Sequence, residues 1–245
     1  MSVDKGYEKS AKYYDLFDDK QNIQFFVEFA KQYDSILDIG AGTGRIAIPI
    51  AQTGVNIVCI EPSKAMQAIF KEKLENLPHL KDRIVLIKSE AKDFHLPQQY
   101  PAAILSGCFD HFLSPMERYQ VMNNIYKHLK AKGRIIFDVF LGLMKEKSWI
   151  VAGVKEQDGK TIKRLIKTDR KKNNILQVTL KYQVYQNDIK ITEDIQHSHA
   201  AITTLEEIEE LLSRVGLRIT NKWGSYQYTP FIEGDKLLIL EAEKD

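Results

Sequence analysis

Residues 37–45 read Leu37-Asp38-Ile39-Gly40-Ala41-Gly42-Thr43-Gly44-Arg45, and this stretch decides the fold. An apolar strand runs directly into three glycines at alternate positions, and a helical pattern follows. Glycine tolerates positive φ and lets the backbone approach a ligand closely. The helix start behind the loop offers N–H groups to a carboxylate or a phosphate. The stretch therefore predicts a ligand-binding loop between a strand and a helix.

Short β-branched runs alternate with helical patterns on both sides of this loop, which is typical of βαβ units and a parallel sheet. We predict an α/β fold, Rossmann-like, with a seven-stranded, mostly parallel sheet and helices on both faces. The expected strands are Ser35–Ile39, Val55–Ile60, Ile84–Ile87, Ala102–Ser106, Arg134–Phe140, Leu217–Lys222 and Lys236–Glu243. The expected helices cover about Gly44–Gln52, Lys64–Leu74 and Pro115–Lys130, and a last helix follows the capping box of Thr204 and Glu207.

Period-two alternation replaces this pattern between Ser148 and Ala201. Asp158-Gly159 and Asn187-Asp188 are plausible hairpin turns inside that segment. We therefore predict a small antiparallel β-sheet inserted into the α/β domain. The expected organisation is a core over residues 1–147, the inserted sheet over 148–201 and a return to the core over 202–245.

Composition narrows the class of protein. The chain has 245 residues and a formal net charge of +2, so its overall field does not favour nucleic acid or a membrane as partner. No apolar run approaches the ~18 residues that a membrane span needs. The N-terminus is polar, and the two cysteines, Cys59 and Cys108, lie in apolar strand-like runs. These features predict a soluble cytoplasmic protein without disulfides.

Two ligand classes use a glycine loop of this kind. The dinucleotide fingerprint needs glycine at its first, third and sixth positions, and the sixth position counted from Gly40 is Arg45. A bulky arginine disfavours NAD at this loop. The second strand ends at Glu61, whose carboxylate is placed to accept hydrogen bonds from both hydroxyls of a ribose. That acid suits NAD and S-adenosylmethionine equally, so Glu61 alone does not discriminate.

The spacing of Gly40, Gly42 and Gly44, with Asp38 two residues upstream, resembles the first motif of class I S-adenosylmethionine-dependent methyltransferases. The resemblance covers residues 13 to about 140. At Ser89-Glu90 the chain departs from the family's usual glycine and aspartate. The resemblance implies S-adenosylmethionine as cofactor, S-adenosylhomocysteine as product, no metal, and a cofactor site made of Tyr14, Asp38, Gly40, Ala41, Gly42, Gly44, Glu61, Pro62, Ser63, Met66, Glu90, Ala91, Gly107 and Cys108.

The inserted sheet is similar in place to the lid of small-molecule methyltransferases such as nucleotide-sugar amine N-methyltransferases. This resemblance implies a small-molecule methyl acceptor under the lid. Alternation puts Arg164 among apolar neighbours on one face and His199 on another. Both are candidate acceptor contacts. Arg164 as a surface side chain with its stem on the sheet, and His199 as a histidine satisfied near a sheet end, stay open as alternatives.

Methyl transfer from a sulfonium is an in-line displacement and needs no metal, so a catalytic triad is not required. His111 follows the fourth strand, where α/β folds bind ligands, and is our candidate general base. A packing role for His111 is the alternative. Asp138 at the end of the fifth strand either orients the acceptor or caps the chain as it leaves the sheet.

Four functions remain open from the sequence. The first is a methyltransferase acting on nitrogen or oxygen of a small molecule. The second is an RNA or protein methyltransferase that reads its substrate with the basic lid, where ten basic residues face four acidic ones between Lys155 and Lys190. The third is a non-catalytic module that binds S-adenosylmethionine. The fourth is an NAD oxidoreductase. The sequence leaves the oligomeric state unknown.

Overall fold

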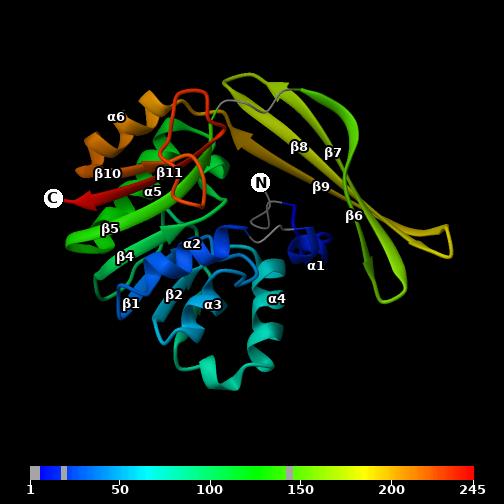
Figure 1. Cartoon of the computed structure of the whole chain (residues 1–245), viewed down its shortest axis with the longest axis horizontal. Coiled ribbons are helices and arrows are strands. Elements are labelled where there is room, and N and C mark those ends of the chain that lie inside the picture. The colour runs from blue at the N-terminus through cyan, green and yellow to red at the C-terminus, as the bar shows by residue number, and fades with distance from the viewer. Residues whose placement is uncertain (1–5, 18–20, 142–145) are drawn as a thin grey trace.

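A computed structural model of the chain describes residues 6–17, 21–141 and 146–245. Within these ranges the chain forms a seven-stranded sheet and a separate four-stranded sheet (Figure 1). The larger sheet has the order β10-β11-β5-β4-β1-β2-β3 and is parallel except for β11. Its strands are β1 (Ser35–Ile39), β2 (Asn56–Ile60), β3 (Ile84–Ile87), β4 (Tyr100–Leu105), β5 (Leu129–Phe140), β10 (Leu217–Trp223) and β11 (Leu237–Lys244). The expected fold class is confirmed.

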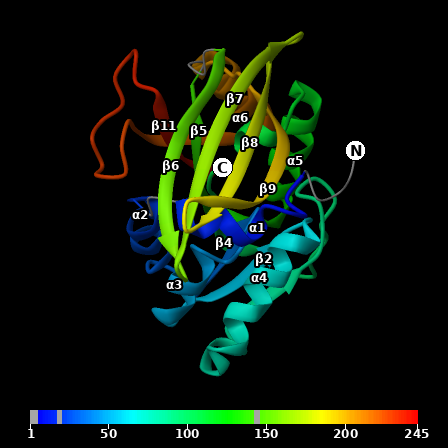
Figure 2. The same ribbon diagram turned by 90° about the vertical axis from the view of Figure 1, so that its right-hand side faces the viewer.

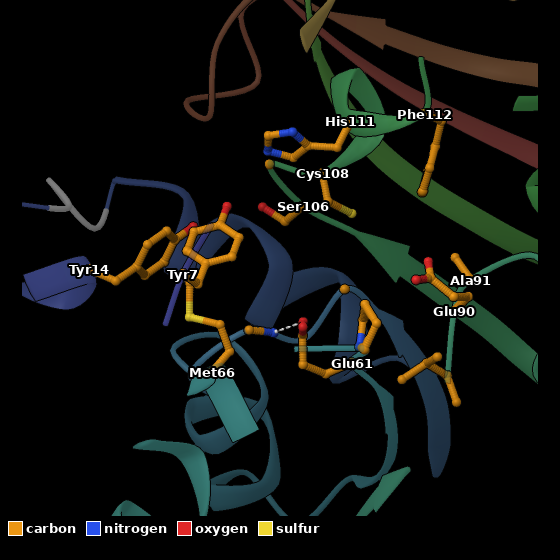
Figure 3. Close-up of a pocket in the computed structure, with 15 residues that line it drawn as sticks. Tyr7, Tyr14, Glu61, Met66, Glu90, Ala91, Ser106, Cys108, His111 and Phe112 are labelled. Carbon is orange, nitrogen blue, oxygen red and sulfur yellow. Dashed lines mark hydrogen bonds between the residues drawn. The ribbon is translucent and has the colours of Figure 1, made fainter. Parts of the chain in front are cut away.

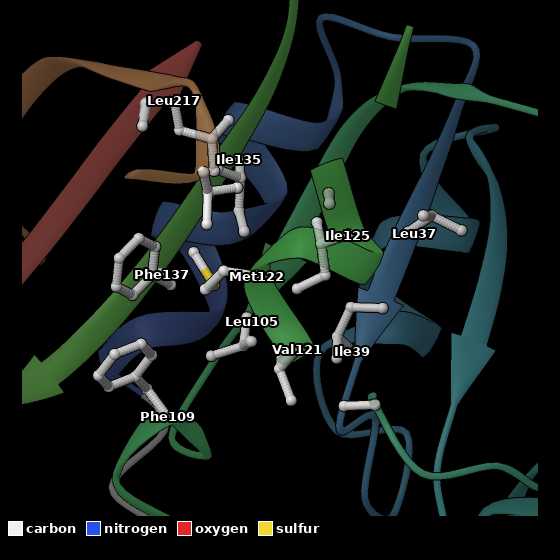
Figure 4. Packing of buried hydrophobic residues seen from close by; sticks show 14 of the residues in the cluster. Leu37, Ile39, Leu105, Phe109, Val121, Met122, Ile125, Ile135, Phe137 and Leu217 are labelled. Carbon is white, nitrogen blue, oxygen red and sulfur yellow. The ribbon is translucent and has the colours of Figure 1, made fainter. Parts of the chain in front are cut away.

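Helices cover both faces of this sheet because the central strands are apolar on both sides. Leu37 and Ile39 pack on the face that carries α5 and α6, whereas Ile36 packs on the face that carries α2 and α3. Figure 4 shows the first of these layers, in which the helix residues Met122 and Ile125 lie among the strand residues. The helices are α1 (Ala11–Tyr14), α2 (Gln21–Ala30), α3 (Ala47–Gln52), α4 (Lys64–Glu75), α5 (Pro115–His128) and α6 (Leu205–Val215), with 3-10 turns η1 (Asp15–Phe17), η2 (Pro78–Leu80) and η3 (Phe109–His111).

Helix ends follow the capping residues that the sequence contains. Ser114 accepts a hydrogen bond from the Glu117 N–H at the start of α5. At the start of α6, Thr204 and Glu207 form the reciprocal capping box that we predicted. The helix ends at Gly216, whose φ of 91° only glycine adopts readily.

The smaller sheet is the lid, a single antiparallel layer that extends to one side of the core in Figure 1 and is seen face-on in front of the core in Figure 2. Two of its hairpins turn at the predicted pairs, where Asp158, Asn187 and Asp188 all take positive φ as tight hairpin turns demand. A third turn at Asn173-Asn174 also has positive φ at both residues. The lid strands are β6 (Lys147–Gln157), β7 (Lys160–Lys171), β8 (Ile175–Gln186) and β9 (Ile189–Ala201).

Some element bounds differ from the sequence expectation, each for a local reason. The helix after the glycine loop begins at Ala47 rather than Gly44, because Gly44 takes a φ of 75° that a helix does not allow. Strand β5 begins at Leu129 instead of Arg134, since its first residues already pair with β4 at Tyr100. The expected strand over Ala102–Ser106 begins earlier, at Tyr100, and ends at Leu105.

Candidate active site

The glycine loop lies at the carboxyl ends of β1 and β2 and is held by both. The Gly40 and Ala41 N–H groups donate to the Ile60 carbonyl at 2.8 and 3.2 Å. The Glu61 carboxylate accepts from the Gly42 N–H and from the Ser63 N–H, each at 2.8 Å. One acidic side chain therefore joins the glycine loop to the start of α4, and Glu61 is only 6% exposed.

Two of the glycines are needed for close packing as well as for their backbone angles. A Cβ on Gly40 would stand 2.7 Å from the Cys108 Sγ, and a Cβ on Gly44 would stand 2.3 Å from the Phe70 ring. A Cβ on Gly42 would have the Gly40 carbonyl oxygen as its nearest neighbour, at 4.0 Å, so there is room beside this glycine. The first and third glycines thus let neighbouring elements reach the loop, while the second leaves room for what binds there.

The loop forms one wall of a pocket that collects residues from the ends of four strands (Figure 3). Glu90 and Ala91 follow β3, and the Phe112 ring lies beyond β4. Pro62 and Met66 come from the start of α4. Opposite the loop the pocket is bounded by Tyr7, Tyr14, Ser106, Gly107, Cys108 and His111. Its walls combine apolar surface with a few carboxylates and hydroxyls, as in ligand pockets generally.

Asp38 lies behind the loop in a smaller adjoining pocket that also contains Ala41 and Arg45. Its carboxylate is 3% exposed, and its Oδ2 has no hydrogen-bond partner. Burial, followed by the neighbouring Glu61 charge, raises the pKa of Asp38 to about 7. Arg45, the residue at the sixth position of the glycine motif, donates from Nη1 to Asn22 Oδ1 at 2.6 Å. This hydrogen bond links the loop to α2.

Asp138 supports the loop after β4 and lies outside the pocket wall. Its carboxylate accepts from the Gly107 N–H at 2.5 Å, the Ser106 hydroxyl at 3.1 Å and the Tyr226 hydroxyl at 2.7 Å. Burial raises the pKa of Asp138, while these three hydrogen bonds oppose the rise. These contacts hold the loop after β4, and a role of Asp138 toward an acceptor stays a prediction.

His111 ends η3 and lines the pocket. Its Nδ1 lies 2.9 Å from the His199 carbonyl oxygen. A carbonyl only accepts hydrogen bonds, so Nδ1 carries the proton and the Nε2 of the neutral ring carries the lone pair. That tautomer is the one a general base at Nε2 requires. His199 takes part through its backbone, and its neighbours Gln196, Ser198 and Ala200, on the opposite face of β9, line the cleft described next.

A cleft of about 850 Å³ opens between the core and the lid. The core wall includes Asp110, His111 and Phe140, and the lid wall includes Arg164 and Tyr182. Four residues, Tyr7, Tyr14, Gly107 and His111, line both this cleft and the pocket at the glycine loop. The two cavities therefore meet at His111.

The N-terminal segment fills the space between core and lid, where α1 lies in Figure 1. On the core side, Asp15 accepts from the Thr43 hydroxyl at 2.7 Å and pairs with Lys73. On the lid side, Ser10 donates to Gln196 Oε1 at 2.5 Å, and the Tyr13 ring stacks on Tyr182 with centroids 4.8 Å apart. Burial raises the pKa of the Tyr7 phenol in this segment, so it stays neutral at physiological pH.

Most predicted site residues come together, and some lie behind the walls. Gly44, Ser63, Asp138 and His199 support the site without lining either cavity, and Ser63 caps α4 by accepting from the Met66 N–H. Sequence reasoning missed Tyr7, Phe17, Ser106, Asp110, Phe112 and Tyr182. Position after β4 could have indicated Asp110 and Phe112, whereas nothing in the sequence connects Tyr7 or Phe17 to this site.

Two further findings concern charge and ligands. Basic lid residues pair with lid acids: Lys167 with Asp169 at 3.0 Å, and both Lys181 and Lys190 with Glu193 at 3.6 and 3.1 Å.

In the part of the chain that the structure describes, no group of three or more His, Cys, Asp or Glu side chains is arranged to hold a metal ion. Over the same ranges no helix has the length and apolar character to cross a membrane.

Comparison with known proteins identifies the core. A family model described as a methyltransferase domain matches residues 36–133, which contain the glycine loop, Glu61 and β3 to β4. Residues 36–133 thus resemble a methyltransferase domain. The chain is also similar to an uncharacterized methyltransferase of Bacillus licheniformis, at 28% identity over 124 residues. The match covers 46% of this chain and 55% of that relative, so the chain spans about half the length of this curated relative.

Solved structures extend the likeness beyond the methyltransferase domain to nearly the whole chain. An S-adenosylmethionine-dependent methyltransferase from Clostridium acetobutylicum superposes with a TM-score of 0.79 at 15% identity, covering 97% of this chain and 96% of that one. The sugar N-methyltransferase KedS8 from Streptoalloteichus sp ATCC 53650 superposes with a TM-score of 0.75 at 18% identity, covering 95% and 93%. At these identities the likeness establishes the shared fold, and the coverage includes the lid.

Proposed function

We propose that this chain transfers a methyl group from S-adenosylmethionine to a nitrogen or oxygen atom of a small molecule held under the lid. The observation that carries the proposal is the meeting of two cavities at His111. One cavity has the walls expected for the cofactor, and the other is a cleft of about 850 Å³ between the core and the lid. A reaction between two bound molecules needs such a junction.

The residues of the first cavity fit S-adenosylmethionine. Glu61 at the end of β2 presents a carboxylate that could accept hydrogen bonds from the hydroxyls of a ribose. The same carboxylate accepts hydrogen bonds from two backbone N–H groups, which hold it in place. Glu90, Ala91 and Phe112 form a partly apolar wall suited to a flat base. Gly40 and Gly42, with the open space beside Gly42, leave room for the amino-acid part.

S-adenosylmethionine supplies a methyl group on a positively charged sulfur, which becomes a neutral thioether when the acceptor forms its bond to carbon and the sulfur keeps the electron pair. The protein's part is to hold the acceptor in line, exclude water and remove a proton. His111 would take that proton at Nε2, because the His199 carbonyl holds the proton of the neutral ring on Nδ1. Tyr7 and Tyr14 would cover the reacting groups from the N-terminal side.

A small acceptor is supported over RNA or protein. The N-terminal segment packs against the lid through an apolar cluster of Tyr13, Phe17, Ile162, Tyr182 and Val184, and Tyr7, Tyr14 and Phe17 of this segment line the cleft. Several basic lid residues are engaged with lid acids rather than grouped into an uncompensated strip. The likeness to a sugar N-methyltransferase over nearly the whole chain agrees with a small acceptor. A cytoplasmic location stays a prediction.

The test begins with the cofactor. Calorimetric titration of the full chain with S-adenosylhomocysteine and with NADH should show micromolar binding of the first and none of the second. Glu61→Ala should weaken S-adenosylhomocysteine binding by about 10- to 100-fold, because hydrogen bonds to a charged group contribute about 1.5–3 kcal/mol. Glu72→Ala, an exposed acid on α4, is the matched control. Binding of NADH without S-adenosylhomocysteine would overturn the proposal.

A further inference from the structure

Two oppositely charged side chains at the cleft have polar atoms without a partner. Among the described residues, the structure leaves four buried side-chain polar atoms without a hydrogen bond: Asp38 Oδ2, Asp110 Oδ1, Arg164 Nε and Thr203 Oγ1. Asp110 and Arg164 both line the cleft under the lid, whereas Asp38 lies behind the glycine loop. Buried polar atoms are nearly always hydrogen-bonded, so two unmatched groups on one cleft call for an explanation.

Asp110 lies on the core wall of the cleft, one residue before His111. Its Oδ2 accepts only a long hydrogen bond, 3.4 Å, from the Phe140 N–H. The nearest compensating charge is Arg118, whose Nη1 donates to the Phe112 carbonyl at 3.0 Å instead. Burial raises the pKa of Asp110 to about 7. A carboxylate in this state gains most from a ligand that brings N–H donors and positive charge.

Arg164 lies on the lid wall of the same cleft. Its guanidinium stands over the Phe17 ring at 4.8 Å, which fixes the side chain toward the cleft and away from the outer face of the lid. Its guanidinium is hydrogen-bonded to Tyr182, but among the described residues it forms no salt bridge and its Nε lacks an acceptor. Lys155 adds a second positive charge to this wall. A ligand oxyanion, carboxylate or phosphate, would supply the missing acceptor.

Apolar side chains line the cleft together with the two charged groups. They include Val154, Val178, Leu180 and Tyr182 from the lid and Phe140 from the core. This arrangement suits a molecule that has a positive end, an apolar body and a negative end. A neutral alcohol could hydrogen-bond to one of these groups but brings no charge opposite to either, so the charges of Asp110 and Arg164 would stay uncompensated.

The geometry points to an acceptor that is a small zwitterionic amine, with its ammonium against Asp110 beside His111 and its carboxylate or phosphate against Arg164. This inference deepens the proposed function and rests on it. It chooses nitrogen over oxygen as the methylated atom, and it makes Asp110 and Arg164 the residues that select the substrate.

The chemistry agrees with the position of His111 next to Asp110. An ammonium has no lone pair, so one N–H proton must leave before the nitrogen can form a bond to carbon. Nε2 of His111 receives that proton. The nitrogen pair then forms the N–C bond while the S–C pair stays on sulfur, which leaves an N-methylammonium, a neutral thioether and a protonated His111. Asp110 keeps the nitrogen in place throughout and stabilises its charge at both ends of the step.

The experiment uses the full chain and four flexible probes that differ only in their ends. They are 6-aminohexanoate, 6-aminohexyl phosphate, hexylamine and 6-hydroxyhexanoate, each incubated with S-adenosylmethionine, with the product identified by mass. We expect one of the two zwitterions to be methylated on nitrogen at least about 10-fold faster than hexylamine or 6-hydroxyhexanoate. The faster zwitterion identifies the anion as carboxylate or phosphate.

Two variants and their matched controls test the residues. Asp110→Asn should lower the rate on amine probes by about 10- to 100-fold, and Arg164→Met should remove the preference for the zwitterion over hexylamine. Asp82→Asn and Arg170→Met make the same chemical changes at exposed positions and should have no effect.

Asp110→Asn should also raise the unfolding midpoint by about 2–5 °C, because it removes an unsatisfied carboxylate, whereas a structural role would lower it.

The outcomes separate the two proposals. All five proteins should bind S-adenosylhomocysteine within about threefold of one another, since neither Asp110 nor Arg164 lines the cofactor pocket. If they bind it but 6-hydroxyhexanoate is the best probe, no amine is methylated, or Asp110→Asn leaves the amine rate unchanged, the zwitterion assignment is wrong. Loss of S-adenosylhomocysteine binding in the wild-type protein would instead overturn the proposed function.

Discussion

The core and the lid place their sheets in different surroundings. Central core strands such as β1 and β4 are covered on both faces, and Ile36, Leu37, Ile104 and Leu105 are fully buried. The lid is a single layer. Lid residues line the cleft and contact the N-terminal segment, whereas others are open to solvent, and Ile189 is 69% exposed. Backbone geometry therefore shapes the proposed cofactor site in the core. The lid wall of the cleft is shaped instead by side chains on a single layer.

The difference predicts where substitutions are tolerated. A site built from backbone N–H groups and tightly packed glycines admits few sequences, so the cofactor pocket is constrained by the fold itself. A wall made of side chains on a single layer changes with each substitution and leaves the fold intact. Recognition of the anionic end of the acceptor should therefore depend on the lid, through Arg164, and cofactor binding on the core. The predictions below test this contrast, beginning with the largest effect.

The largest contrast should come from two glycines with positive φ. Gly44→Ala in the core puts a Cβ 2.3 Å from the Phe70 ring at a φ of 75°, and we expect a loss of about 3–5 kcal/mol in the free energy of unfolding. Gly159→Ala in the lid has a similar φ of 71° but open space around it, so about 1 kcal/mol is expected. Urea unfolding measures both. Equal losses would contradict the contrast.

His111, where the pocket and the cleft meet, should affect the turnover number more than the affinity for S-adenosylhomocysteine. His111→Ala removes the base and should lower the turnover number by about 100-fold, with S-adenosylhomocysteine affinity within about threefold of wild type. His95→Ala, on an exposed loop after β3, is the matched control. Steady-state rates and calorimetry give the two quantities. A parallel loss of affinity and turnover would assign His111 to the cofactor site instead of catalysis.

Buried carboxylates of the core should make stability depend on pH. The folded pKa of Asp38 is raised to about 7, so the folded chain binds more protons than the unfolded chain between about pH 4 and pH 7. The free energy of unfolding then falls as pH rises through this window. Asp38→Asn should remove about 2 kcal/mol of that fall. Urea unfolding at pH 5 and pH 8 checks the sign, and a pH-independent difference between the two proteins would refute it.

The smallest effect is expected on the outer surface of the lid. Glu193 pairs with Lys181 and Lys190 and accepts from Gln183 at 2.8 Å, all of them in the lid. Exposed ion pairs contribute little, so Glu193→Gln should leave the unfolding midpoint within about 1 °C of wild type. Thermal unfolding at low and high salt is the measurement. A drop of several degrees would show that charge, rather than apolar packing, holds this layer together.

The same contrast explains what could be predicted from sequence. The glycine loop, Glu61 and the capping residues of α5 and α6 follow local rules of backbone conformation, so spacing alone located them. The lid strands and two of their turns were also predictable, because alternation and turn residues are local. Contacts between distant segments were not. Tyr7 reaches the pocket only because the N-terminal segment folds back between core and lid.

Roles within the site depend on tertiary contacts in the same way. The sequence places Asp138 at the end of a strand, and only the structure shows its three hydrogen bonds to the loop after β4 and to Tyr226. Similarly, strand alternation put His199 on a face, but its backbone carbonyl is what contacts His111. Asp110 and Arg164 became a pair of interest only when the cleft brought them to opposite walls.

The N-terminal segment has a consequence for the timing of a reaction cycle. Asp15 bonds to the core through Thr43 and Lys73, while Ser10 bonds to the lid through Gln196. One short stretch of chain thus bonds to both sides of the junction, and its residues Tyr7 and Tyr14 line the pocket and the cleft. We expect that these contacts must break before either bound molecule leaves. Release of the products, rather than methyl transfer, should therefore limit turnover.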